Sequence, residues 1–328
     1  YQIDDFMEHC VMKGLSQKTN KSYEQTLIIF ARYLKDEHNV SNFKDVKEEH
    51  ITNYITYIKE RGKYTVTSKE ESKMYNYPER RKDLGDKVSD ITINNYIRNI
   101  KVFFHYLEET RYIKKNPMKK VREIKTARKP LFFIDDADFK KLIHCLDTSK
   151  FSEYRDKVIT MTLLDTGMRI GECLKIELVN VDLKERTIFL PAETTKGKKG
   201  RYVFFSQQLA QHLKRWIEFQ DRYRETDYLF CTNYGKSLQV TNFETNLRKY
   251  VNRAGLENIH PHVFRNNFAK RFLMNGGDIY ALSRILGHSS VTVTEKAYLD
   301  LNTNDLKKQY SNFSPLARMS KQGRNCDD

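Results

Sequence analysis

The sequence has no long apolar run and no cysteine pattern, and these absences exclude several classes of protein. No stretch of its 328 residues approaches membrane-spanning length, and its first residues lack the pattern of a signal peptide. The five cysteines form no close pair, which argues against a disulfide framework and against a CxxC zinc site. We therefore expect a soluble cytoplasmic protein with no membrane partner, whose thiols are free or buried in a reducing compartment.

Motifs for metal and nucleotide cofactors are missing as well. The sequence has no HExxH motif and no compact cluster of carboxylates. Gly235-Lys236-Ser237 is similar to the end of a Walker loop, but Phe230 stands where that loop needs its first glycine. We therefore expect chemistry that uses no cofactor, neither ATP nor a metal ion.

Basic residues, in contrast, are in excess throughout the chain. There are 58 Lys and Arg against 43 Asp and Glu, which gives a net charge of +15. Residues 1–130 hold 27 basic and 19 acidic residues, and the remainder holds 31 and 24. The length suits two domains, and a positive balance in both favours a polyanionic partner that both domains contact.

The stretch from residue 260 to residue 300 carries the most informative pattern. His262 and Arg265 are one helical turn apart, so they project from the same face of a helix. A second apolar-periodic segment ends at Gly287, a helix stop signal, and His288 follows at once. Tyr298 comes ten residues later. Attack of a phenol on a phosphodiester needs planar donors for the phosphate oxygens, a nearby base and a proton for the leaving oxygen.

A second arginine stands in a distinctive setting upstream. The apolar helix around residues 158–164 breaks at Thr166-Gly167, which sets Arg169 at the start of the next helix. Free amides at helix starts attract anions, and a guanidinium fork can hold two phosphate oxygens at once. We interpret Glu172, one turn further on, as a structural partner that orients neighbouring groups rather than as a catalyst.

These motifs together resemble one known family. HxxR, then LGHSS, then a tyrosine ten residues after that histidine, preceded by TGMRIGE, is similar to the tyrosine recombinase (phage-integrase) family, which includes the Xer and Cre recombinases. The resemblance implies a mainly α protein. It would have an N-terminal helical core-binding domain and a mixed α/β catalytic domain that is mostly helical with a small antiparallel sheet.

The resemblance also implies a role for each motif residue. Tyr298 would attack the scissile phosphate and form a 3′-phosphotyrosine, while Arg169 and Arg265 would hold the non-bridging oxygens. His262 would act as general base or proton shuttle, and His288 would position the phosphate and the tyrosine. One residue departs from the family pattern, because Asn266 stands where members commonly have histidine.

The general acid is expected on a hairpin. Residues 187–190 and 202–205 read as two strands around the turn 194–200. A lysine at its tip can reach the DNA minor groove and give a proton to the leaving 5′ oxygen. In the family this lysine is usually the first of the turn, which corresponds to Lys196, although Lys198 and Lys199 could substitute.

We divide the chain into segments on the basis of its patterns. Residues 1–113 would form the core-binding domain, with a short helix at 2–13, a longer one that opens at Ser16 and carries an apolar stripe to Leu34, and helices near 47–61 and 90–110. The polar stretch 63–89 is an insertion, with a hairpin suspected around Tyr64-Val66 and Met74-Tyr77. Residues 114–130 would be a basic linker with few apolar anchors, 131–301 the catalytic domain, and 302–328 a tail that in relatives docks on the adjacent protomer.

DNA contacts are expected from Lys18, Lys21, Arg98, Lys101, Lys125, Arg128, Lys198 and Lys199.

Three functions stay open at this point. The first is a site-specific recombinase, integrase or transposase of a mobile element. It would act as a homotetramer on specific core sites in double-stranded DNA, with an accessory directionality factor or a partner recombinase as further candidates for partners. The second is a type IB topoisomerase, which shares the tyrosine chemistry but works as a monomer. The third is a DNA-binding accessory protein that has lost catalysis.

Overall fold

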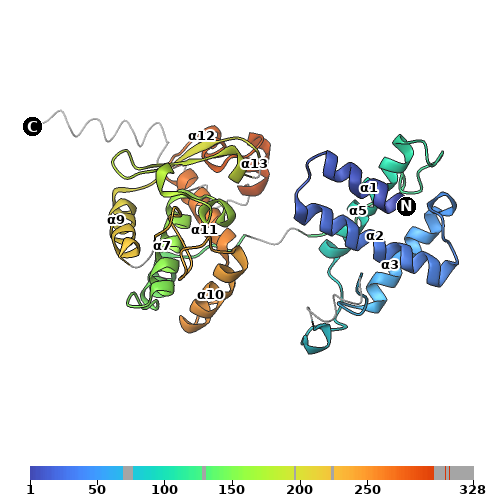
Figure 1. The fold of residues 1–328 in the computed structure, drawn as a ribbon, viewed down its shortest axis with the longest axis horizontal. Helices are drawn as coiled ribbons and strands as arrows, with labels where there is room; N and C mark the ends of the chain where they lie inside the picture. The colour runs from blue at the N-terminus through green and yellow to red at the C-terminus, as the bar shows by residue number, and fades with distance from the viewer. Residues whose placement is uncertain are drawn as a thin grey trace, which may run out of the picture. The chain divides into compact units, whose positions relative to one another are not determined.

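A computed structural model describes residues 1–68, 77–127, 131–195, 197–222 and 225–298, together with residues 307 and 310. The chain divides into two compact units, Tyr1–Arg128 and Lys129–Asp328. Both are mainly helical, and the second holds a small antiparallel sheet, as predicted (Figure 1). In the described ranges, no helix has the length and apolar character needed to span a membrane.

The N-terminal unit is built from helices whose starts are visible in the sequence. Ser16 and Ser89 cap two of them, because their hydroxyl oxygens accept hydrogen bonds from the backbone N–H groups of Thr19 (3.2 Å) and Thr92 (3.3 Å). The helices are α1 (Gln2–Met12), α2 (Gln17–His38), α3 (Glu48–Arg61) and α5 (Asp90–Glu109), with 3₁₀ turns η1 (Phe43–Asp45) and η2 (Pro78–Arg80).

Apolar stripes of these helices meet in one aromatic-rich core. Leu27, Phe30 and Leu34 recur at helical spacing on α2, and all three are buried. Phe30 packs against Tyr54 of α3, with ring centroids 4.8 Å apart, and against Phe104 of α5. The opposite face of α2 stays in solvent, which leaves its lysines exposed.

The ends of the 63–89 insertion are held together by backbone contacts. The N–H of Lys63 donates to the Asp86 carbonyl (2.8 Å), and the N–H of Gly85 donates to the Lys63 carbonyl (2.9 Å). A Cβ on Gly62 would lie 2.3 Å from the Gly85 carbonyl oxygen, so only glycine permits this approach. The suspected hairpin is not formed at Tyr64-Val66, which adopt a turn and bend, and residues 69–76 of its other half lie outside the described residues.

The segment after α5 differs from the expected linker in its first part. Met118 is fully buried and Val121 nearly so, both in the core of the N-terminal unit. Asn94 of α5 also pairs with Ile124 through two hydrogen bonds of 2.9 and 2.8 Å. Two apolar side chains and one side-chain amide are therefore enough to hold residues 114–124, despite their high charge.

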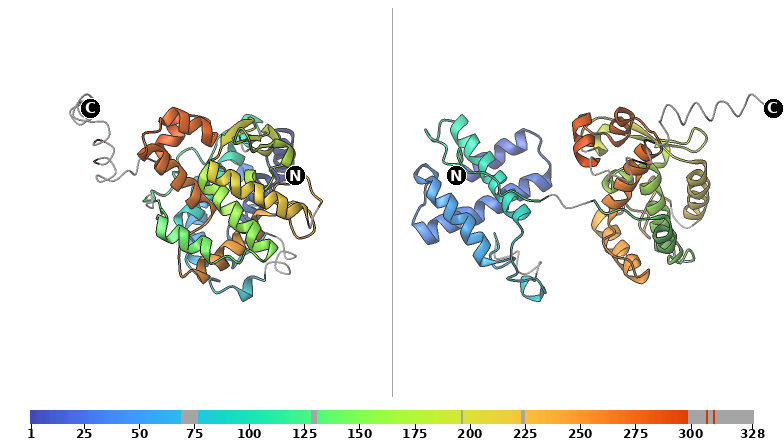
Figure 2. Two further views of the ribbon diagram at one scale, coloured as in Figure 1. Left: turned by 90° about the vertical axis from the view of Figure 1, so that its left-hand side faces the viewer. Right: turned by 180° about the vertical axis from the view of Figure 1, so that it is seen from behind.

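The C-terminal unit contains the sheet and the helices around it (Figures 1 and 2). Strands β1 (Val181–Asp182), β2 (Thr187–Leu190) and β3 (Arg201–Phe204) lie in that order, with Leu190 paired to Arg201. β1 was not predicted, because two residues carry no alternation pattern. The helices are α6 (Asp136–His144), α7 (Phe151–Thr166), α8 (Ile170–Cys173), α9 (Gln207–Asp221), α10 (Val240–Arg253), α11 (Pro261–Met274), α12 (Ile279–Leu286) and α13 (Val291–Tyr298). Further 3₁₀ turns are η3 (Leu178–Asn180) and η4 (Ala192–Thr194).

Helix α7 is the scaffold against which the site is assembled. It packs against α9, α10 and α11, and its buried residues include Val158, Ile159 and Leu163. Because α7 ends at Thr166 and runs beside α11, its C-terminal end lies close to the first turns of α11. The segments that carry the two arginines are thereby brought together.

Candidate active site

Arg169 follows a forced turn at the end of α7. Gly167 has φ +65°, in the left-handed region, and a Cβ there would lie 2.3 Å from the ring of Phe268. Two residues later Arg169 takes an extended conformation (ψ 145°) as the N-cap of α8, where the sequence predicted a helix start. Its side chain is 25% exposed, so the guanidinium remains within reach of solvent.

Glu172 is buried beneath this arginine and is surrounded by donors. It is 2% exposed and accepts hydrogen bonds from the Arg169 backbone N–H (3.0 Å) and from Arg169 Nη1 (3.0 Å). Arg201 of β3 donates to both carboxylate oxygens, Nη1 at 3.1 Å and Nη2 at 2.6 Å. Burial alone would raise the pKa of Glu172, but the Arg201 hydrogen bond and the charges of both arginines outweigh it and lower that pKa.

Arg265 is held by backbone carbonyls. Only 4% of this residue is exposed, and Nη1 donates to the carbonyl of Gly167 (2.8 Å). Nη2 donates to the carbonyl of Leu286 (2.9 Å) and to Nε2 of His288 (2.9 Å). One guanidinium therefore joins the turn before Arg169 to the C-terminal end of α12.

His288 is a neutral imidazole with a defined tautomer. Burial, followed by the charges of Arg265, Arg169 and Arg201, lowers the pKa of His288 to about 4. Since Arg265 can only donate, Nε2 must accept and the ring proton resides on Nδ1. Nδ1 lies 2.7 Å from Oγ1 of Thr294, a fully buried residue of α13, and donates to it.

His262 lies one turn before Arg265 on α11, and its side chain is exposed. Partial desolvation and the charges of His260, Arg265 and Arg169 lower the pKa of His262, so the ring is neutral near pH 7 and can accept a proton. Asn266, the departure from the family pattern, is partly buried beside it. The hydrogen bonds of Arg265 to the Gly167 and Leu286 carbonyls and to His288 do not involve residue 266.

The two remaining catalytic candidates are only partly described. Tyr298 is the last residue of α13, which packs against α11 and α12, and its side chain lies outside the described part of the structure. Lys196 also lies outside it. Its neighbours Lys198 and Lys199 are exposed, and Thr195 Oγ1 closes the turn by donating to the Lys199 carbonyl (2.9 Å).

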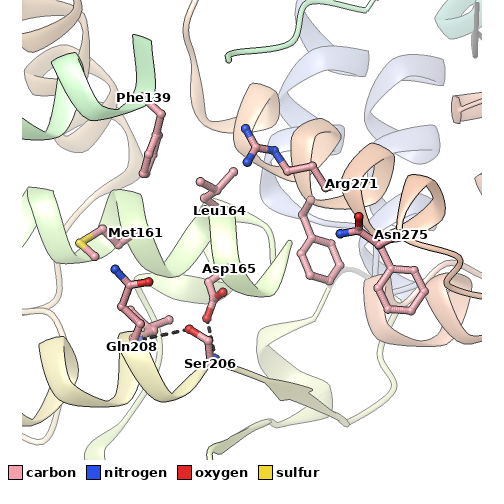
Figure 3. A pocket seen from close by; sticks show the side chains of 11 residues that line it. Phe139, Met161, Leu164, Asp165, Ser206, Gln208, Arg271 and Asn275 are labelled. Carbon is pink, nitrogen blue, oxygen red and sulfur yellow. Dashed lines mark hydrogen bonds between the residues drawn. The ribbon is translucent and has the colours of Figure 1, made fainter. Parts of the chain in front are cut away.

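Two cavities lie near these elements, and one contains candidate residues. A groove of about 880 Å³ between β3 and α12 is lined by residues that include Lys199, Arg201 and His288. A smaller pocket of about 360 Å³ lies among α6, α7, α9 and α11, where Asp165 accepts a hydrogen bond from the Ser206 N–H (Figure 3). Among the predicted catalytic residues whose side chains the structure describes, none lines that pocket, whereas His288 lines the groove beside β3.

Two residues of this arrangement, Arg201 and Thr294, were missed by sequence reasoning. Arg201 reads as one more basic residue beside a lysine-rich turn, and Thr294 reads as a helical polar residue. Neither position has a local signal, because their partners Glu172 and His288 come from other elements.

The two helices of the N-terminal unit that carry predicted DNA contacts, α2 and α5, are joined by side-chain hydrogen bonds. Asn99 of α5 donates hydrogen bonds to Ser22 Oγ (3.1 Å) and to Thr26 Oγ1 (2.9 Å) of α2. Lys21 and Arg98, which adjoin these residues in the sequence, therefore lie near the contact between the two helices. Arg98 there pairs with Glu123 (2.6 Å). Arg128 lies outside the described residues, and the other predicted contacts are all exposed: Lys18, Lys21, Lys101, Lys125, Lys198 and Lys199.

Comparison with known families and structures agrees with this architecture. A model described as the phage integrase family matches residues 133–305, and one described as the phage integrase N-terminal SAM-like domain matches residues 3–73. The tyrosine recombinase XerC of Oceanobacillus iheyensis is 26% identical and covers 97% of each chain. XerC of Thermodesulfovibrio yellowstonii is 30% identical over 70% of this chain and 78% of that protein.

A solved structure shares the fold. The Tn1549 transposon integrase, in complex with a circular intermediate DNA, is similar with a TM-score of 0.71 at 17% identity. The match covers 95% of this chain and 99% of that one, so it extends over both units.

Proposed function

The chain belongs to the phage integrase family of tyrosine recombinases, and on that premise we propose that it cuts and rejoins DNA at specific sites through a 3′-phosphotyrosine at Tyr298. The observation that carries the proposal is the hydrogen bonding of Arg265. It joins the segment of Arg169 to that of His288, so that motifs more than 90 residues apart meet at one point, as a single phosphate would require.

Each residue has a part in the cleavage step. The phenol oxygen of Tyr298 attacks phosphorus while its proton passes to neutral His262, and the bond from phosphorus to the 5′ oxygen breaks. Arg169 and Arg265 stabilise the charge that builds on the non-bridging oxygens, and Lys196 gives a proton to the leaving oxygen. Rejoining reverses these steps with the 5′ hydroxyl of another strand, and the covalent link conserves the bond energy in the meantime.

The pKa of His288 depends on whether a phosphate is bound. Burial and then the charges of three nearby arginines lower its pKa to about 4, and the negative charge of a bound phosphodiester offsets part of the arginines' effect and raises that pKa. The Nδ1–H bond to Thr294 keeps Nε2 directed toward Arg265 until then. His288 thereby positions the phosphate beside the second arginine.

Residues outside the catalytic site would bind the DNA backbone and allow several copies of the protein to assemble on it. We assign phosphate contacts to the exposed lysines of α2 and α5 and of the hairpin turn, and these contacts would make binding fall as salt rises. The DNA substrate places the protein in the cytoplasm, where four copies would act together. The transposon integrase structure holds a circular intermediate DNA, which supports integration, excision or transposition of a mobile element as the outcome.

A nicked suicide duplex made from the flanks of the native locus tests the proposal. The wild-type protein is expected to form a covalent protein–DNA adduct, and Tyr298→Phe to form none while it still binds the duplex. Strand exchange between two duplexes identifies a recombinase, whereas relaxation of any supercoiled plasmid identifies a type IB topoisomerase. Binding without any adduct from the wild-type protein would identify a DNA-binding accessory protein.

The tail is tested separately. We propose that residues 302–328 dock on the adjacent protomer and couple tyrosine activity around the tetramer. Deletion of 303–328 should then reduce the yield of synaptic tetramers more than it reduces binding to one site. An unchanged tetramer yield in native gels would rule this docking out.

A further inference from the structure

We propose that Arg201 is a positioning residue that holds the two halves of the catalytic site in register and anchors the β2–β3 hairpin to both. The inference rests on the proposed function, since it concerns the same site. It adds a residue that contacts neither the phosphate nor the nucleophile and acts through its neighbours.

The first half is held through Glu172. Arg201 forms a bidentate pair with that carboxylate, and its side chain is only 11% exposed. Glu172 also holds Arg169, so two positive charges share one negative charge. With Arg201 present, Glu172 is neutralised and a net positive charge remains for the phosphate. Without it, the buried carboxylate would compete with the phosphate for Arg169.

The second half is held through the end of α12. Nε of Arg201 donates to the Ile285 carbonyl (3.0 Å), while Arg265 donates to the next carbonyl, that of Leu286. The last carbonyls of a helix have no partners within it, and cations are favoured at this end. Arginines from β3 and α11 therefore hold consecutive carbonyls just before His288.

Two features of the structure favour glycine at position 287, its backbone conformation and its close contact with Arg201. Its φ of +65° is in the left-handed region, and a Cβ there would lie 2.9 Å from Arg201 Cζ, Nε and Nη1. The Arg201 guanidinium thus lies directly against the backbone between Leu286 and His288, and this close contact fixes the start of the His288 segment.

The hairpin is anchored at the same point. Arg201 is the first residue of β3 and is paired with Leu190 of β2, so the turn that contains Lys196, Lys198 and Lys199 leaves the sheet there. Its bonds to Glu172 and Ile285 fix the base of the lysine turn relative to α8 and α12. The lysine turn and the phosphate site therefore share one anchor.

Single-turnover cleavage of the nicked suicide duplex tests the inference in the full-length protein. Arg201→Gln is expected to slow cleavage about 100-fold, because small misplacements of catalytic groups have effects of this size. Its affinity for an uncut duplex should change less than about twofold, since Arg201 is not assigned to DNA. Lys184→Gln, which removes an exposed positive charge from the turn between β1 and β2, is the matched control and should match wild type.

A pH profile separates positioning from a general structural role. In Arg201→Gln, burial would dominate and the pKa of Glu172 would rise. Cleavage by the variant should therefore show an additional decrease as pH rises, because the ionised Glu172 then competes with the phosphate for Arg169. Among the described residues, the charged and titratable groups that face this site are Arg169 on α8, His262 and Arg265 on α11, and His288 after α12, and all of them remain in the variant. The double variant Glu172→Gln/Arg201→Gln should lose this additional decrease.

The outcomes distinguish this inference from the proposed function. A wild-type protein that forms no adduct refutes the proposed function itself. A wild-type protein that cleaves, with Arg201→Gln as fast as Lys184→Gln, overturns the inference alone. Should Arg201→Gln fail to fold, Arg201→Lys decides, because it keeps the charge and loses the fork: slow cleavage with normal DNA binding is expected, and wild-type cleavage overturns the inference.

Discussion

The two arginines of the site are oriented in different ways for the same task. Arg169 is 25% exposed and leans on a buried carboxylate that a second arginine keeps ionised. Arg265 is 4% exposed and is held by two carbonyls and a neutral imidazole. An ion pair can be lost by protonation, whereas a carbonyl dipole cannot. The orientation of Arg169 therefore depends on the charge of Glu172, whereas the orientation of Arg265 depends on the positions of backbone carbonyls.

The largest expected effect on the cleavage rate comes from changing Arg265, the arginine that backbone carbonyls hold. Arg265→Lys keeps the positive charge but cannot reach the Gly167 and Leu286 carbonyls and the phosphate together, so cleavage should fall about 1000-fold. Arg169→Lys, the matched variant in the other half, should fall about 100-fold. Single-turnover rates on the suicide duplex measure both. A larger loss for Arg169→Lys would reverse the comparison.

The next largest effect is expected on the stability of the C-terminal unit, through Glu172, the carboxylate that holds Arg169. Glu172→Gln leaves two arginines beside a neutral amide in a buried position, and we expect the C-terminal unit to lose about 3 kcal/mol of unfolding free energy. Urea denaturation measures the loss. Glu185→Gln, an exposed carboxylate in the turn between β1 and β2, should cost nothing measurable. Equal unfolding curves for the two variants would show that Glu172 is not a buried ion.

A smaller effect is expected from Thr294. Thr294→Val removes the acceptor of the His288 Nδ1–H and leaves that donor unpaired, at a cost of about 1 kcal/mol. Cleavage should fall roughly tenfold as the ring loses its orientation. Thr294→Ser keeps the hydroxyl and should restore most of the rate. Failure of serine to rescue would mean that the threonine methyl group, rather than its hydroxyl, matters.

A pH dependence of stability is also expected from the half of the site that holds Arg265 and His288. The pKa of His288 is about 4 in the folded protein, below the ordinary value, so the unfolded chain binds more protons at mildly acidic pH. This contribution to stability is present above about pH 6.5 and is lost as pH falls toward 4. Unfolding curves of wild type and His288→Asn across this range should converge at low pH. Parallel curves would contradict the low pKa.

Much of the fold was predictable because its signals are local. Ser16, Ser89 and Asp135 cap helices through bonds to residues three positions later, and Gly167 and Gly287 end helices in the left-handed region. The pattern of the motif residues was also local, since His262 and Arg265 need only one helical turn to share a face.

Other features depended on contacts between distant segments. The basic stretch after α5 looked like a free linker, yet Met118 and Val121 fill the N-terminal core. Charge density misled the prediction here, because the two apolar side chains are buried while the basic side chains of the described part of this segment stay exposed. β1 was missed since its two residues are a strand only by pairing with β2.

The sequence by itself predicted which residues would carry phosphodiester chemistry, and it correctly placed Arg169 at a helix start and His288 after a helix end. The sequence also indicated Glu172 as an orienting partner, since it lies only three residues after Arg169. Only the tertiary structure added Arg201 and Thr294, because they act through bonds between elements. A hydrogen bond across tens of residues leaves no periodic pattern in a chain. It exists only once packing has removed water and left each buried charge or donor to find its partner.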